Sequence, residues 1–73
     1  MFYLIEVTNY NNGTEEAKAI YSYETEDEAI SKWHSKMGGA MSNATYETEL
    51  LIAVNSVGAV IRSEYWQRKH TEE

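Results

Sequence analysis

The chain has 73 residues and no cysteine, and its six basic and twelve acidic side chains give a net charge of -6 at pH 7. This length allows one domain, which buries only about 60% of the surface that the unfolded chain exposes. The absence of cysteine excludes disulfides and thiolate metal sites, and the negative charge disfavours direct DNA binding because phosphates are repelled. We expect a single cytoplasmic domain that gains stability from self-association.

Two strands are expected at the start of the chain. Residues 2–8 are apolar and rich in β-branched side chains, and residues 17–24 alternate between two faces. The Asn and Gly residues within 9–13 tolerate the backbone of a tight reversal, which predicts a hairpin. The N-terminus lacks the basic stretch of a signal peptide, and no apolar run approaches the ~20 residues of a membrane span. We therefore expect neither secretion nor a membrane anchor.

A helix is predicted to begin after Thr25. Its hydroxyl can accept from the amide of Glu28 while the Glu28 carboxylate bonds the amide of Thr25, which is a capping box. Apolar residues then recur at intervals of three or four, so one stripe should face a sheet. The members of this stripe are Ile30, Trp33, Met37 and Met41, with Ala29 and Ala40 beside them.

The glycine pair Gly38 and Gly39 falls in the C-terminal part of this helix. A phosphate cradle needs the free amides and positive dipole of a helix N-terminus, so the pair is not expected to bind an anion. We expect instead that these small residues let the helix approach the sheet or a second subunit closely. On this interpretation Gly39→Leu should harm folding or association.

A second hairpin is predicted after the helix. Residues 46–55 become almost entirely apolar at 50–54, a turn at 55–58 ends in glycine, and residues 59–66 return as the partner strand. Residues 67–73 form a polar tail, so the domain should span residues 1–66. The order β-β-α-β-β predicts an α+β fold of two layers, with a four-stranded antiparallel sheet and one helix packed on one face.

One helix can cover only one face of such a sheet. The other face should expose Phe2, Leu4 and Leu51, together with whichever neighbouring aromatic side chains point away from the helix. An apolar face of this kind favours a homodimer, formed through the open face or through a sheet edge.

The sequence offers little for catalysis or metal binding. It contains neither a nucleophile elbow nor an H-E-x-x-H motif, and no acid lies at a metal-ligand spacing from His34, the only histidine besides His70. Glu47 and Glu49 share one face of a strand, where such a pair is usually solvated. We expect no enzyme activity, no metal and no cofactor.

The last strand contains the best candidates for a small-molecule site. Aromatic planes there could stack on a base while cationic groups hold phosphate. The alternative, which we favour, is that the same aromatic residues complete the core or a dimer seam. The candidate ligand-binding residues are Arg62, Tyr65, Trp66 and Arg68, with Tyr21 and Tyr23 as companions.

The acidic side chains concentrate in the first half of the chain. They could present carboxylates to the basic groove of a nucleic-acid-binding protein by mimicking phosphates, although a solvated face is the more common explanation. The residues of this candidate protein-binding surface are Glu15, Glu16, Glu24, Glu26, Asp27 and Glu28.

The chain resembles a group of short proteins found in gut Firmicutes and in their phages and mobile elements. The resemblance rests on F-Y-L-I-E-V-T, K-A-I-Y-x-Y-E-T-x-D-E-A-I, H-S-K-M-G-G-A-M and G-A-V-I-x-S-E-Y-W, and covers nearly all residues up to Trp66. No functional residue transfers from this group. Small acidic phage proteins of this size are often inhibitors of bacterial defence, including anti-CRISPR proteins and sponges for immune nucleotides.

The function we expect is therefore that of a non-enzymatic phage or mobile-element protein, which inhibits a bacterial defence system inside the host cell by direct binding. Its acidic surface would dock on a basic, nucleic-acid-binding effector such as a CRISPR nuclease. Two alternatives are an oligomeric sponge that sequesters an immune nucleotide signal, and a structural or regulatory homodimer without an anti-defence role.

Overall fold

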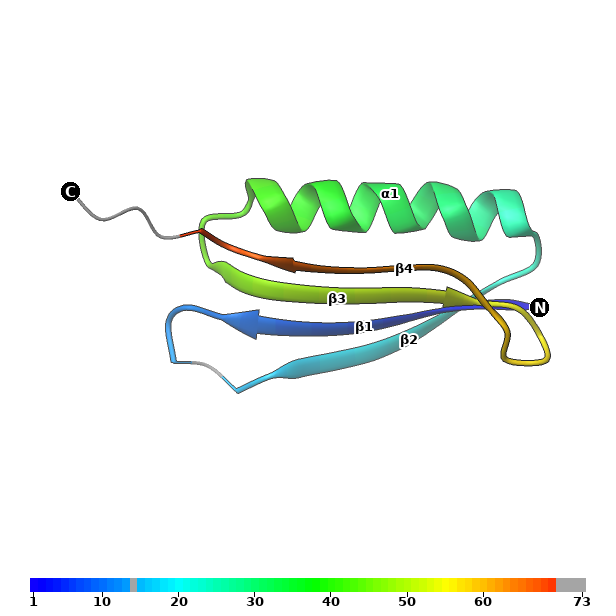
Figure 1. Ribbon diagram of the computed structural model, residues 1–73, viewed down its shortest axis with the longest axis horizontal. Helices are drawn as coiled ribbons and strands as arrows, with labels where there is room; N and C mark the ends of the chain where they lie inside the picture. Colours follow the sequence, from blue (N-terminus) through cyan, green and yellow to red (C-terminus); the bar gives the residue numbers. More distant parts are fainter. Residues whose placement is uncertain (14, 70–73) are drawn as a thin grey trace.

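The computed structural model describes residues 1–13 and 15–69 and has the order β-β-α-β-β (Figure 1). One open antiparallel sheet of four strands carries a single helix on one face, which confirms the predicted α+β class. The elements are β1 (Phe2–Tyr10), β2 (Ala17–Tyr23), α1 (Glu26–Ser42), β3 (Tyr46–Val54) and β4 (Val60–Gln67).

The strand order is β2-β1-β3-β4, so the first strands of the two hairpins lie side by side in the centre. Their pairing begins with Tyr3 opposite Val54 and continues through Ile5 opposite Ile52. Each hairpin contains one glycine with positive φ, Gly13 and Gly58, both at 85°, a conformation that side chains with a Cβ rarely adopt. These two glycines allow the reversals that the sequence predicts.

The helix begins as the sequence predicts. The hydroxyl of Thr25 accepts from the backbone N–H of Glu28 at 3.2 Å, and acidic residues in the first turn complement the positive end of the helix dipole. At its other end, Ser42 donates its hydroxyl to the carbonyl oxygens of Gly38 and Gly39 at 3.0 and 3.2 Å. The glycine pair thus lies in the C-terminal part of α1, as expected.

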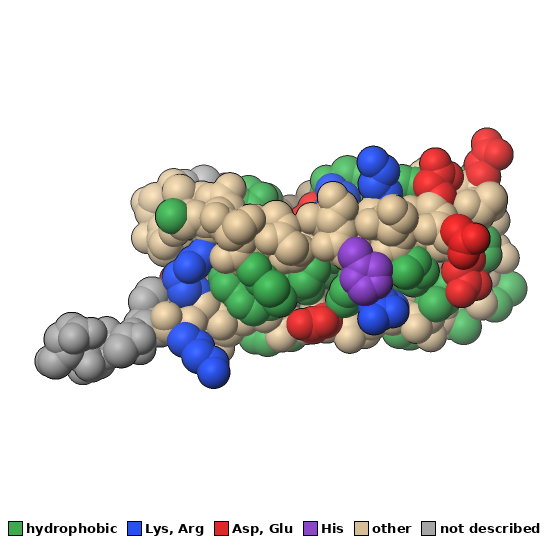
Figure 2. Space-filling model, turned by 90° about the horizontal axis from the view of Figure 1, so that it is seen from above, with side chains coloured by type: hydrophobic (Ala, Val, Ile, Leu, Met, Phe, Trp, Pro, Cys, Tyr) green, Lys and Arg blue, Asp and Glu red, His purple; other side chains and the backbone are tan. Residues whose placement is uncertain are grey.

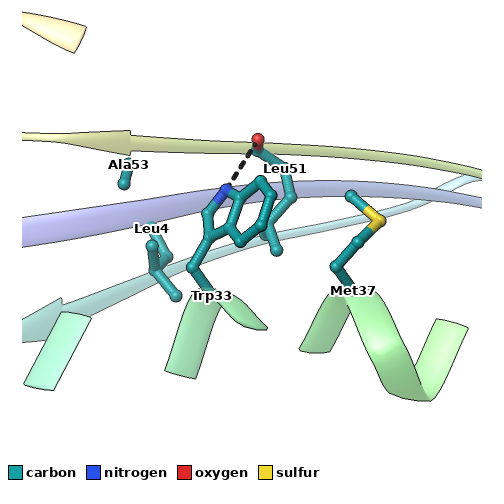
Figure 3. Packing of buried hydrophobic residues seen from close by; sticks show 5 residues of the cluster. All are labelled: Leu4, Trp33, Met37, Leu51 and Ala53. Atoms are coloured by element: carbon teal, nitrogen blue, oxygen red, sulfur yellow. Dashed lines mark hydrogen bonds between the residues drawn. The ribbon is translucent and has the colours of Figure 1, made fainter. Parts of the chain in front are cut away.

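The core lies between α1 and the central strands (Figure 3). Trp33 and Met37 point from the helix toward Leu4 on β1 and toward Leu51 and Ala53 on β3. The Trp33 indole N–H donates to the carbonyl oxygen of Leu51 at 3.1 Å, so the polar atom of this buried ring is satisfied.

The buried stripe of the helix differs in part from the predicted one. Trp33 and Met37 are buried as expected, but the stripe is completed by Ala29 and Ala40, whereas Ile30 is half-buried and Met41 is exposed. Small residues at both ends of the stripe let the helix lie close to the sheet along its length, which the apolar periodicity alone did not indicate.

The assignment of the two sheet faces was wrong for Leu4 and Leu51. Both are fully buried under α1, and Phe2 is half-buried. The open face instead carries the residues between them in the strands. Because successive strand residues alternate, the pattern separates two sets of side chains but does not say which set the helix covers.

The expectation for the glycine pair was also wrong with respect to the sheet. Gly38 and Gly39 are both exposed, and a Cβ added to either would meet no atom within 4 Å. They therefore do not permit a close approach between the helix and the sheet.

The folded part also extends beyond the boundary predicted at residue 66. Gln67 is the last residue of β4, and the backbone N–H of Arg68 donates to the carbonyl oxygen of Glu47 at 2.8 Å. Residues 70–73 of the predicted tail, including His70, lie outside the described residues.

Candidate functional site

The face of the sheet opposite α1, which we call the open face, is mainly apolar along three rows of residues. The strand registers place Ile20, Ile5, Ile52 and Ser63 in one row across the four strands. Two further rows flank it. They contain Lys18, Val7, Leu50 and Tyr65 on one side, and Ser22, Tyr3, Val54 and Val60 on the other.

Within residues 1–13 and 15–69, no helix covers the open face (Figure 1). Ile20, Val60 and Tyr65 on the edge strands are 72%, 62% and 59% exposed, while the central residues of the rows are half-buried by their neighbours. The only charged side chain in the three rows is that of Lys18, which lies on the edge strand β2 and forms an exposed ion pair with Glu16 at 3.4 Å. This surface has the composition of an interface core, which is depleted in charge.

A second unusual feature lies under the helix, where Glu49 is fully buried. The expectation that Glu47 and Glu49 form a solvated pair is wrong for Glu49. One of its carboxyl oxygens accepts from the hydroxyl of Thr8 on β1. The other, Oε2, has no hydrogen-bond partner among the described residues.

The neighbourhood of Glu49 favours its protonated form. Burial, followed by the neighbouring Glu6 side chain, raises the pKa of the Glu49 carboxyl to about 8. A protonated Oε2 can donate to Glu6, which accepts from the Tyr21 hydroxyl at 3.2 Å and lies 3.8 Å from the Lys36 ammonium. Glu49 has no contact with solvent, so the arrangement provides a buried hydrogen-bonded acid and no site that a substrate could reach.

The burial of Glu49 had a weak signal in the sequence. The residue alternates with Leu51 and Ala53, so it shares their face of β3. What the sequence does not reveal is its partner, because Thr8 is 41 positions away and meets Glu49 only through the register of β1 and β3.

The candidate ligand-binding residues do not form one site. Tyr21 and Tyr23 lie on β2 and the remaining four lie on or just after β4, at the opposite edge of the sheet. Tyr65 lies opposite Leu50 in the open face, whereas Trp66 packs against the core on the helix side. The part of the chain that the structure describes encloses no pocket.

The cationic members of this set already have aromatic and backbone partners. Arg62 lies over the Trp33 ring at 4.8 Å and Arg68 over the Trp66 ring at 5.1 Å. Arg68 also donates to the carbonyl oxygens of Asn43 and Tyr46 at 2.6 and 2.8 Å. These contacts support the interpretation that the aromatic residues of β4 serve packing.

The six acidic candidates are exposed but do not form one array. Glu15 and Glu16 precede β2, whereas the other four follow it, so the two groups lie at opposite ends of that strand. We call the second group the acidic end; Figure 2 shows its side chains together around the start of α1. Its members are Glu24, Glu26, Asp27 and Glu28.

Residues 1–13 and 15–69 contain no group of three His, Cys, Asp or Glu side chains that could hold a metal ion. The ring of His34 packs edge-on against that of Trp33, with centroids 5.2 Å apart. Over the same residues, no helix is long and apolar enough to cross a membrane. Comparison with protein-family models, with curated proteins and with solved structures finds no match to this chain.

Proposed function

We propose that this chain is a non-enzymatic binding protein that acts as a homodimer, and that it inhibits a bacterial defence protein by docking its acidic end on a basic, nucleic-acid-binding surface. The observation that carries the proposal is the gathering of four exposed carboxylates around the start of α1 (Figure 2). No basic side chain lies within residues 24–28.

The geometry suits binding by charge. The acids occupy both the end of β2 and the first turn of α1, so they project from a supported part of the fold. Closely spaced carboxylates resemble the phosphates of a nucleic acid strand and are attracted to the lysines and arginines that bind it. The partner class is therefore a protein with a basic nucleic-acid groove, such as a CRISPR nuclease.

The test is charge reversal at the acidic end. A variant with Glu26→Lys, Asp27→Lys and Glu28→Lys should bind a guide-loaded CRISPR nuclease from a Firmicute at least roughly tenfold more weakly, because like charges then face each other. Binding of the unmodified chain should also weaken as salt rises. Affinity is measured by interferometry and inhibition by a DNA cleavage assay.

The matched control reverses Glu15 and Glu16 at the other end of β2. This variant should keep its affinity and its inhibition. Unchanged inhibition after reversal at the acidic end, with the fold intact by circular dichroism, would remove the proposal.

A second candidate is a structural or regulatory homodimer without an anti-defence role. The open apolar face favours this candidate, since the face suits self-association whether or not the acidic end binds a partner. A phage-challenge assay separates the two functions, because a chain without an anti-defence role leaves phage growth unchanged. The nucleotide-sponge alternative has little support, since Tyr65 and Trp66 lie on opposite faces of β4 and Arg62 and Arg68 already lie over tryptophan rings.

A further inference from the structure

The area of the open face is near that of a small dimer interface. Its strands have seven to nine residues, which at ~3.3 Å per residue and about 4.8 Å between strands gives a face of roughly 26 by 19 Å. The flat footprint is about 500 Å², and the relief of the side chains makes the accessible area larger. That area approaches the ~800 Å² per partner of a standard interface.

The chemistry of this face fits a second copy of itself. In a two-fold dimer a side chain on the axis meets its own counterpart, so a charge there faces a like charge, and a charge elsewhere on the face is buried against mainly apolar residues. The open face avoids this conflict, because Lys18 is the only charge in its three rows and lies at the edge. The edges of the sheet suit self-pairing less well, since β2 carries Lys18 and β4 carries Arg62 and Glu64.

The ends of the molecule determine how two copies align. One end of the sheet is the acidic end, and Figure 2 shows Lys and Arg side chains at the other end, where acidic residues also lie. We call the latter the mixed end. It contains Glu15, Glu16, Glu47, Lys18, Arg68 and Lys69. Two acidic ends laid side by side would repel each other, whereas an acidic end laid over a mixed end, whose three acids and three bases cancel, meets no net charge of the same sign.

We propose that two copies of this chain pack their open faces together, with the two-fold axis running across the strands, so that the acidic end of each copy lies over the mixed end of its partner. The assignment rests on the proposed homodimer and names its surface and its orientation. The two sheets lie about 10 Å apart, with strand directions within about 30° of each other. The row of Ile20, Ile5, Ile52 and Ser63 follows the axis, so each of its side chains faces its counterpart.

The first experiment introduces a charge into the row of residues that follows the two-fold axis. Ile20→Lys and Ile52→Lys each place two lysines opposite each other in the dimer, and the dissociation constant should rise roughly 100-fold. Ser31→Lys on the exposed side of α1 adds the same charge away from the interface and should leave the dimer intact. The readout is sedimentation equilibrium, with circular dichroism to verify the fold. Ile20 is 72% exposed in the single chain, so its variant decides the test if Ile52→Lys does not fold.

Two outcomes would overturn the assignment in different ways. If the unmodified chain is monomeric at about 100 μM, well above the micromolar dissociation constants of weak interfaces, both the homodimer and this surface are wrong. The proposed docking of the acidic end on a defence protein is tested separately, by the charge-reversal variant described above. If the chain dimerises and the lysine variants dimerise equally well, the homodimer stands and the open face is the wrong surface.

The second experiment tests the orientation. The chain has no cysteine, so Ser56→Cys in the exposed turn between β3 and β4 gives each copy a single spin label. An axis across the strands places the two turns at opposite ends of the dimer, with labels ~30 Å apart or more by pulsed electron resonance. An axis along the strands places them at the same end, about 20 Å apart, and that result would overturn the proposed orientation.

Discussion

The carboxyl group of Glu49 lies under α1 between the hydroxyl of Thr8 and the side chain of Glu6. Its neutral form can satisfy both neighbours, by accepting from Thr8 and donating to Glu6. Its charged form leaves Oε2 buried without a donor and beside another acid. The fold therefore stabilises the proton on this side chain.

This arrangement predicts that stability falls as pH rises. The Glu49 pKa is raised from 4.5 to about 8 in the folded chain, so between these values the unfolded chain loses a proton that the folded chain keeps. The free energy of unfolding should decrease by a few kcal/mol across this window and then level off. Urea unfolding at several pH values measures this dependence.

The matched variants are Glu49→Gln and Glu64→Gln. A glutamine at position 49 can accept from Thr8 and donate to Glu6 at any pH, so its unfolding free energy should vary less with pH and exceed that of the unmodified chain at alkaline pH. Glu64 is exposed, and its variant should retain the normal dependence. Equal pH slopes for all three proteins would contradict the role of Glu49.

At the scale of secondary structure, α1 contains two glycines at positions where no contact within the single chain requires glycine. Gly38 and Gly39 are exposed, their φ angles are not positive, and an added Cβ meets nothing within 4 Å. Gly38→Ala and Gly39→Ala should each stabilise the chain by up to about 1 kcal/mol, because alanine loses less backbone entropy in a helix. This corresponds to ~4–8 °C in Tm for a domain of this size, measured by thermal unfolding.

Gly58→Ala is the contrasting control. Gly58 has φ of 85° in the turn before β4, so alanine should be destabilising there although no atom lies nearby. A loss of stability in both helix variants would contradict the expectation. It would indicate that a second subunit packs against the exposed surface at Gly38 and Gly39, which is the alternative that the sequence suggested.

The elements themselves were predictable to within a few residues because their signals are local. The Thr25 cap, the glycines of the two hairpins and the alternation in the strands all act over short distances. It was harder to predict which face of the sheet the helix covers, since both sides of β1 and β3 are apolar. Whether Leu4 or Ile5 is buried under the helix depends on where the helix packs. Tyr21 and Trp66 lie at opposite edges of the sheet because of the strand order, which no local sequence pattern encodes.

At the scale of the whole molecule, the proposed dimer links stability to concentration. Dimerisation favours the folded chain by mass action, so a hundredfold rise in concentration should add about 2.7 kcal/mol to the free energy of unfolding of the dimer. Tm should therefore increase with concentration in scanning calorimetry. The Ile20→Lys variant is the control and should show a constant Tm. A concentration-independent Tm for the unmodified chain would contradict a stable dimer.

The central position of β1 and β3 also has a kinetic consequence. Each hairpin pairs strands that are close in sequence, so β1 with β2 and β3 with β4 can form early and separately. The pairing of β1 with β3 joins residues far apart in the chain, such as Thr8 and Glu49, which are separated by 41 positions, and must close a loop that contains all of α1. We therefore expect assembly of the two hairpins along this seam to be the slow step of folding, and this step would also bury the Glu49 carboxyl.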